Sequence, residues 1–161
     1  MDKIYEQSET GCCPRFNPEP WEEKEMTFKD KLFLKDHVKS FLHIPLNFGS
    51  VMTRNMEKIS NADAVSPEPL ILSDETSLWG SDIYIAVCKE VSDAEMVKLS
   101  GTFLAKVFEG SYGNTSKWVR AMNDFIKSRD KDIKKLYFFY TTCPKCAKVY
   151  GKNYTVLLAE V

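Results

Sequence analysis

Apolar residues recur at helical spacing in two segments of the chain. The repeating positions are Met52, Met56 and Ile59 in the first segment, and Trp118, Met122 and Phe125 in the second. Spacing of i, i+4 and i+7 places three side chains on one face of a helix. We therefore predict one helix that begins after Pro45 and another that begins near Thr115 or Ser116, either of which can cap its N-terminus.

The remaining segments are rich in β-branched and aromatic residues, which are typical of strands. We predict one or two exposed strands within 26–42, and shorter strands near 70–72, 83–88, 102–108, 136–140 and 154–161. Cys88 ends an apolar run, so we expect its thiol to pack as a small hydrophobic group. The segment 1–25 contains several prolines and no periodic pattern, which predicts an irregular arm.

The order strand, helix, strand, strand occurs twice along the chain. An alignment that sets Met52 on Trp118 also sets Met56 on Met122, and a slightly longer offset sets Gly80 on Gly151. Any two units of this order share such spacings, but the local matches favour a tandem repeat. We therefore predict an α+β fold of tandem β-α-β-β units with pseudo-twofold symmetry, antiparallel sheets and a ligand cleft at the seam. The expected parts are an arm at 1–25 and a domain at 26–161, with unit one at about 26–90 and unit two at about 100–161.

Composition excludes several classes of protein. The chain has 161 residues, of which 43% are hydrophobic, as expected of one globular domain with a sizeable core. Its 22 basic and 23 acidic residues leave a net charge of -1, which argues against direct binding of nucleic acid or an anionic membrane. The sequence shows neither a membrane-spanning run of about 20 apolar residues nor an apolar signal segment, so we expect a cytoplasmic protein. Its oligomeric state stays open.

A more specific signal lies around the second predicted helix. The run Val107-Phe108-Glu109-Gly110-Ser111-Tyr112, followed by Trp118, is similar to the strand, Gly-x-Tyr turn and aromatic helix of the GyrI-like small-molecule-binding family. The resemblance covers about 102–161, and it extends to 26–89 only through the repeat. The chain departs from the family at His43-Ile44-Pro45-Leu46-Asn47, which replaces a glycine-containing turn, and at Cys143-x-x-Cys146.

The resemblance implies two functional classes. Some members are effector domains fused to DNA-binding helices, and others bind xenobiotics or hydrolyse reactive small molecules. No helix-turn-helix fits beside the two units, so direct DNA binding is not expected. We therefore predict binding of a small, partly apolar organic molecule in the cleft, with two alternatives left open: hydrolysis of that molecule, or binding alone by a sensor or sequestering protein.

Three residues are candidates for catalysis. The alignment that sets Met52 on Trp118 also sets His43 on Glu109, and such a pair could divide general base and general acid work. The alternative is that Glu109 is a solvated strand end and that His43 is a half-buried ring. Glu160 alternates with Tyr154, Val156 and Leu158, so it could enter the cleft, where burial would raise its pKa and suit it to a cationic ligand or to acid catalysis. A solvated carboxylate at the chain end is the alternative.

Aromatic residues could form the wall of the ligand site, because their π faces attract cations. The candidates are Trp79, Tyr112, Trp118, Tyr137 and Tyr140. We expect most of them to lie in the core instead, Trp118 above all, whereas Tyr140 and Trp79, next to turns, are the better candidates for the pocket. The sequence contains no G-x-S-x-G motif, so hydrolysis would use activated water rather than a covalent intermediate.

Four cysteines form a separate candidate site. Cys143 and Cys146 have the spacing of a zinc knuckle, and Cys12 and Cys13 could complete a structural zinc site. A redox dithiol at Cys143 and Cys146, which would make the chain a thiol-based redox protein, and unligated thiols are the alternatives. We expect no organic cofactor.

Overall fold

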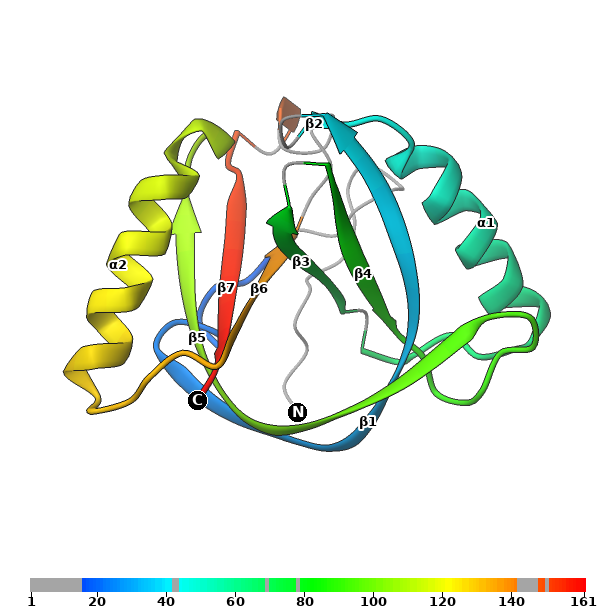
Figure 1. The fold of residues 1–161 in the computed structure, drawn as a ribbon, viewed down its shortest axis with the longest axis horizontal. Coiled ribbons are helices and arrows are strands. Elements are labelled where there is room, and N and C mark those ends of the chain that lie inside the picture. The colour runs from blue at the N-terminus through cyan, green and yellow to red at the C-terminus, as the bar shows by residue number, and fades with distance from the viewer. Residues whose placement is uncertain (1–15, 42–43, 69, 78, 142–147, 150) are drawn as a thin grey trace. The chain divides into compact units, whose positions relative to one another are not determined.

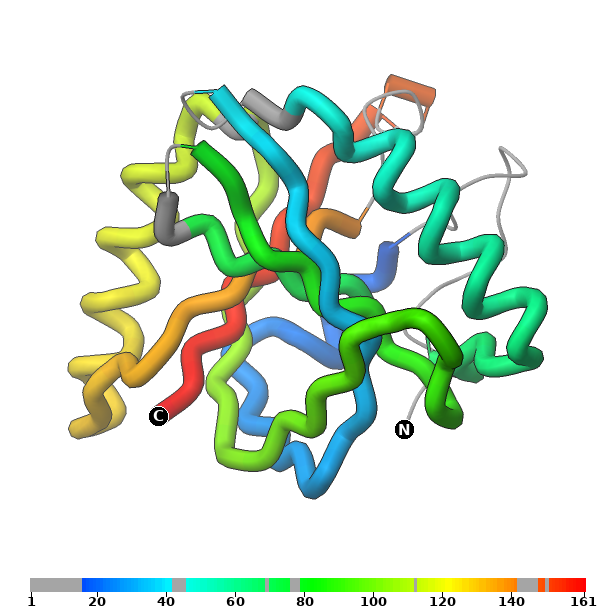
Figure 2. Tube along the Cα trace, turned by 45° about the vertical axis from the view of Figure 1, so that its right-hand side comes forward, coloured from blue at the N-terminus to red at the C-terminus, as the bar shows by residue number. Residues whose placement is uncertain are grey.

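The computed structural model describes residues 16–41, 44–68, 70–77, 79–141, 148–149 and 151–161 (Figure 1). The chain divides into two compact units. One unit is Phe28–Ser100, called here the 28–100 unit. The other joins the described residues up to Thr27 with Gly101–Val161, and we call it the 101–161 unit. The boundaries fall inside two long strands, β1 (Lys24–Phe41) and β5 (Glu95–Glu109), whose traces run on without a break in Figure 2.

The 28–100 unit contains three main strands and a helix. After β1 come the two-residue strand β2 (Ile44–Pro45), helix α1 (Phe48–Asn61), β3 (Ile71–Ser77) and β4 (Gly80–Ala86). Strand β4 pairs antiparallel with both β1 and β3, and β2 pairs with the end of β1. The exposed segment predicted at 26–42 is thus a single strand.

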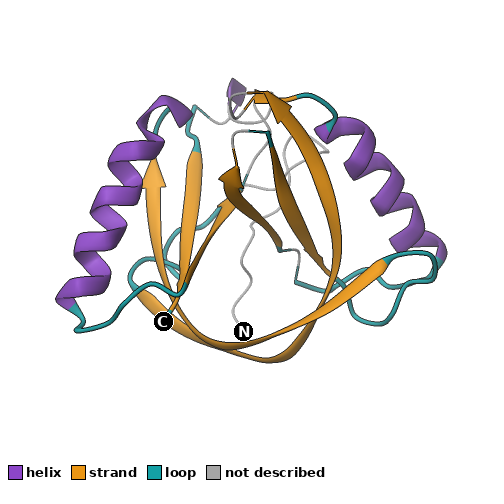
Figure 3. Ribbon diagram, viewed as in Figure 1, coloured by secondary structure: helices purple, strands orange, loops and turns teal. Residues whose placement is uncertain are grey.

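The 101–161 unit has the same order of elements. Strand β5 leads into a short 3-10 turn, η1 (Tyr112–Asn114), and helix α2 (Thr115–Ser128), followed by β6 (Lys135–Tyr140) and β7 (Tyr154–Glu160). Strand β7 pairs antiparallel with both β5 and β6. The predicted α+β class with antiparallel strands is confirmed (Figure 3).

The ends of the two helices correct the alignment of the two units. When Phe48 at the start of α1 is set on Thr115 at the start of α2, the last residues of both helices also coincide. Met52 then corresponds to Val119 rather than to Trp118, so the alignment based on apolar spacing is wrong by one position.

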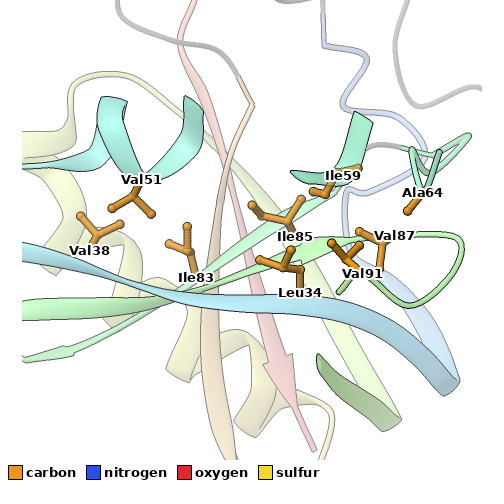
Figure 4. Close-up of a cluster of buried hydrophobic side chains, with 9 residues drawn as sticks. All are labelled: Leu34, Val38, Val51, Ile59, Ala64, Ile83, Ile85, Val87 and Val91. Carbon is orange, nitrogen blue, oxygen red and sulfur yellow. The ribbon is translucent and has the colours of Figure 1, made fainter. Parts of the chain in front are cut away.

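Helix α1 follows the predicted apolar stripe only in part: Ile59 is buried and Met52 is partly buried against the core, whereas Met56 is not. Its buried residues are Val51, Asn55 and Ile59, whereas Met56 is 43% exposed. The core that it covers consists of Leu34, Val38, Val51, Ile59, Ala64, Ile83, Ile85, Val87 and Val91 (Figure 4). Asn55 on the buried face of α1 has a polar partner on β1: its Nδ2 donates to Asp36 Oδ2 at 2.7 Å.

Helix α2 follows its predicted stripe. Trp118, Met122 and Phe125 are all buried, together with Ile126. They pack on Leu104, Phe138, Leu157 and Ala159 from the three strands of the unit. Because the apolar face of α2 lies opposite an apolar sheet, only one rotation of the helix is favourable. The apolar spacing therefore predicts the buried residues of α2 correctly.

Two smaller features complete the description. Cys88 is exposed, and its thiol lies 3.8 Å from the carbonyl oxygen of Asp63, so the expectation that it packs as a hydrophobic group is wrong. The apolar run that suggested this packing ends one residue earlier, at the buried Val87. No helix in the described ranges is long and apolar enough to cross a membrane.

Candidate functional site

Each face of the strands in the 101–161 unit has its own set of side chains. Residues directly opposite each other in an antiparallel pair point to the same face. Leu104 lies opposite Ala159, and both belong to the core beneath α2. The alternate positions therefore form the helix-free face, which carries Glu109 opposite Tyr154, and Phe103 opposite Glu160.

The candidate aromatic residues separate onto the two faces. Tyr137 is opposite Leu158 on the helix-free face and is 2% exposed. Tyr140 and Trp118 lie on the helix side: Trp118 stacks on Phe108 at 5.8 Å between ring centroids, and Tyr140 packs against the same core. Trp118 is thus a core residue of this unit.

The two candidate carboxylates of this face lie far apart. Glu109 is at one end of the β5–β7 pair and Glu160 is at the other, six residues away along β5. At about 3.3 Å per residue, this separation is about 20 Å. Glu109 and Glu160 therefore cannot act on the same reacting atom. The Glu160 carboxylate lies over Gly101, where a Cβ would be 3.3 Å from its Oε1.

The residues before β1 pack beside Glu109. Pro18 O accepts hydrogen bonds from the N–H groups of Trp21 and Glu22, which closes a turn. The rings that flank this turn are buried: Trp21 lies 5.4 Å from Phe139 and Phe16 lies 5.8 Å from Tyr154, between centroids. Part of the segment predicted as an irregular arm is therefore a fixed part of this unit.

This packing forms a hollow of about 340 Å³ at the Glu109 end of the face. Its lining combines three carboxylates with three apolar or aromatic groups: Pro18, Glu19, Glu22, Val107, Glu109 and Tyr154. We call it the acidic hollow. Side chains from distant parts of the sequence thus meet around a single space.

The carboxylate of Glu22 is held in place by the protein. Its Oε1 accepts from Lys106 Nζ at 3.0 Å and its Oε2 accepts from the N–H of Val107 at 3.0 Å. Glu23 accepts a further bond from Lys106 at 3.1 Å. Burial by itself would lower the pKa of Lys106, but its bonds to Glu22 and Glu23 outweigh burial and hold the pKa above its ordinary value of 10.5.

The carboxylate of Glu109, in contrast, is uncommitted. It is exposed, and within the described ranges no hydrogen bond or ion pair engages it. The backbone next to it is fixed, because Gly110 N–H donates to Asn153 O at 3.0 Å and Asn153 Nδ2 donates to Gly110 O at 2.8 Å. Gly110 has φ +127°, a conformation that other residues rarely adopt. These two hydrogen bonds between Gly110 and Asn153, called here the clamp, hold Glu109 beside Tyr154.

The other predicted site residues lie elsewhere or outside the described residues. Trp79 belongs to the 28–100 unit, where it is 61% exposed and its ring centroid lies 5.7 Å from that of Phe41. Tyr112 is in η1. His43, Cys12, Cys13, Cys143 and Cys146 lie outside the described residues. Within the ranges that the structure describes, no three His, Cys, Asp or Glu residues are grouped closely enough to hold a metal ion.

Sequence reasoning missed a second hollow, of about 360 Å³, in the 28–100 unit. It is lined by Lys35, Asp36, His37, Arg54, Asn55, Lys58, Asp82, Asp93, Ala94 and Glu95, and we call it the charged hollow. Arg54 and Asn55 both donate to Asp36 Oδ2 at 2.7 Å, and His37 Nδ1 lies 2.9 Å from Asp82 Oδ1. The signal that could have found it is Asn55, a polar residue that shares a helix face with Val51 and Ile59.

A family model matches nearly the whole chain. The model of a family described as bacterial hydrolase matches residues 3–161. No curated protein matches the chain.

Solved structures share the fold. A hydrolase from Listeria innocua is 13% identical with a TM-score of 0.61, and the match covers 86% of this chain and 92% of that one. An uncharacterized conserved protein from the same organism has a TM-score of 0.59, with the same identity and coverage. SAV2435, whose structure is bound to tetraphenylphosphonium, is 12% identical in sequence to this chain. The TM-score is 0.51, and the match covers 87% of this chain and 93% of that one.

Proposed function

The chain belongs to the bacterial hydrolase family, and from this premise we propose that it binds a small, partly apolar organic molecule in the acidic hollow and hydrolyses it with water activated by Glu109. The observation that carries the proposal is the hollow itself, where an uncommitted carboxylate lies beside an aromatic ring and apolar groups. An apolar wall with a few convergent polar groups is the usual composition of a small-molecule site.

The charge of the hollow favours ligands with positive character. Glu19, Glu22 and Glu109 all line it, and Lys106, which pairs with Glu22, is also bound to Glu23. The aromatic face of Tyr154 also attracts cations. The fold is shared with SAV2435, whose structure contains tetraphenylphosphonium, a lipophilic cation. We infer that organic cations with apolar substituents bind this hollow better than neutral molecules of the same shape.

Hydrolysis requires a base beside the bound molecule. Glu109 can accept a proton from water, because no protein group occupies its carboxylate in the described part of the chain. The water oxygen then bonds to the electrophilic carbon of the ligand, and the proton held by Glu109 passes to the departing group. The clamp between Gly110 and Asn153 holds the base in place during both steps.

The finer predictions belong to this proposal as well. We propose that the family is GyrI-like and that the shared order of elements in the two units reflects a tandem repeat with pseudo-twofold symmetry. The ligand cleft expected at the seam stays a prediction. The roles of His43, Glu160, Trp79, Tyr112, Tyr137 and Tyr140 stay predictions. So does the zinc site at the four cysteines, which metal analysis with thiol titration before and after chelation would decide.

The test separates binding from turnover. Affinity for tetraphenylphosphonium is measured by calorimetry, and hydrolysis is followed with 4-nitrophenyl acetate, a neutral ester. Glu109→Gln should lower kcat for the ester by about 100-fold or more, as removal of a general base does. Glu57→Gln, an exposed carboxylate on α1, is the matched control and should leave both measurements unchanged. Ester hydrolysis that survives in Glu109→Gln would exclude Glu109 as the base.

Binding without hydrolysis is the second candidate function. It is favoured by the structure of SAV2435, which shares the fold and was solved with a bound molecule. Under this alternative, tetraphenylphosphonium binds, affinity falls in Glu19→Gln and Glu109→Gln, and no ester is turned over by the wild-type protein. The chain would then be a sensor or sequestering protein.

A further inference from the structure

We propose that the charged hollow of the 28–100 unit is a binding site for a small organic amine, whose N–H group donates to the side-chain oxygen of Asn55. The proposal concerns a different unit from the acidic hollow and does not depend on hydrolysis.

The key observation is the state of the Asn55 amide. Asn55 is only 2% exposed, yet it lines the hollow, so the surface that it keeps is turned toward that space. Both hydrogens of its Nδ2 are used, one by Asp36 Oδ2 at 2.7 Å and one by Val51 O at 2.9 Å. Two acceptors around one atom identify it as the nitrogen.

Among the described residues nothing donates to Oδ1, which is therefore the group offered to a ligand. A carbonyl oxygen accepts only, so the ligand must donate.

The cations of the hollow are already held by the protein. Arg54 Nη2 donates to Asp36 Oδ2, and Lys58 Nζ donates to Asp93 O at 2.7 Å. Lys35 Nζ lies 3.7 Å from Asp82 Oδ2. Each basic side chain thus has a hydrogen-bond or ion-pair partner from its own unit, which makes an anionic ligand a poor match.

The acidic groups are only partly used. Within the described residues, no ion pair engages the carboxylates of Asp93 and Glu95. His37 Nδ1 lies 2.9 Å from Asp82 Oδ1, and it donates there because a carboxylate only accepts. The ring is fixed over Gly80, where a Cβ would overlap it. Apart from His37, the lining carries three basic and four acidic side chains.

An ammonium group satisfies both requirements at once. It supplies an N–H to Asn55 Oδ1 and a positive charge to Glu95 and Asp93. A divalent cation fits less well, because the described acidic and histidine side chains are not grouped as metal ligands. The volume of about 360 Å³ accommodates an amine with a short carbon chain.

Three probes of similar size test the proposal by NMR titration of the full chain. They are n-butylammonium, which has charge and N–H donors; butyltrimethylammonium, which has charge alone; and n-butanol, which has neither a charge nor an N–H. We expect n-butylammonium to shift the side-chain amide resonances of Asn55, and to bind at least tenfold more tightly than the other two. Equal affinity for the two cations, or no shift at Asn55 with n-butylammonium, would overturn the proposal.

Variants locate the site. Glu95→Gln removes an exposed charge and should weaken n-butylammonium binding severalfold, whereas Glu90→Gln, also exposed in the same unit, should leave it unchanged. Asn55→Leu should abolish the preference for n-butylammonium over butyltrimethylammonium. If Asn55→Leu does not fold, the proposal is still tested by Glu95→Gln and by titration of the wild-type protein with the three probes. Both of these experiments use folded protein. Unchanged affinity in Glu95→Gln would refute the assigned charge contact.

Discussion

The two helices contact their sheets in different ways, although their units share one order of elements. The buried face of α2 is wholly apolar, with Trp118 and Met122 on apolar strand residues. The buried face of α1 includes Asn55, which bonds to Asp36 on β1. The buried face of α1 thus contains a polar pair between helix and sheet, and both residues of this pair line the charged hollow.

The largest expected effect on stability comes from replacing a methionine by alanine, and one methionine on each helix allows a comparison. Met122→Ala should lower the free energy of unfolding by about 2–5 kcal/mol, because Met122 is fully buried and its removal leaves a cavity. Met56→Ala should change it by less than about 0.5 kcal/mol, because Met56 is 43% exposed. Urea denaturation measures both. Equal losses would mean that α1 buries the face that apolar spacing predicts.

These two methionines also show what the sequence could and could not predict. The helices, most strands and the antiparallel α+β class follow from periodicity, because apolar faces must be buried. The burial of Asn55 in place of Met56 does not, because a polar side chain is expected to face solvent unless a partner such as Asp36 lies opposite it. Glu109 could be selected as a candidate because it directly precedes the predicted turn into the second helix. Glu19 and Glu22 could not, because only the folded chain brings Pro18 and Tyr154 to one hollow.

The next effect concerns the polar contact of α1. Asn55→Ala removes two hydrogen bonds and leaves Asp36 with fewer donors, so the free energy of unfolding should fall by about 1–3 kcal/mol. Asn123→Ala on α2 is the matched control. Within the described residues its amide donates only to Val119 O on an exposed surface, and we expect a loss below about 0.5 kcal/mol. A similar loss in both variants would remove the distinction between the two helices.

The same contact should make the stability of the 28–100 unit depend on pH. Partial burial tends to raise the pKa of Asp36, but bonds from Arg54, Asn55 and the N–H of His37 outweigh burial and hold the pKa below its ordinary value of 3.8. A lowered pKa stabilises the fold above 3.8, and this contribution is lost as the pH falls through the native value. Asp36→Asn should therefore be less stable than wild type at pH 6, and the difference should shrink below pH 4. Thermal unfolding at both pH values measures it, and a constant difference would contradict the assignment.

The smallest effect comes from the corresponding ionic contact of the 101–161 unit and has the opposite pH dependence. Bonds to Glu22 and Glu23 raise the pKa of Lys106 above 10.5, so its contribution is complete below 10.5 and is lost as the pH rises through the native value. Because the glutamates are about half exposed, we expect Lys106→Met to cost only about 0.5–1 kcal/mol at neutral pH. The difference from wild type should fade in alkaline solution and in high salt, as surface ion pairs do. If instead the loss persists in 1 M salt, the contact of Lys106 with the ring of Phe125, at 5.3 Å from the centroid, is what stabilises this unit.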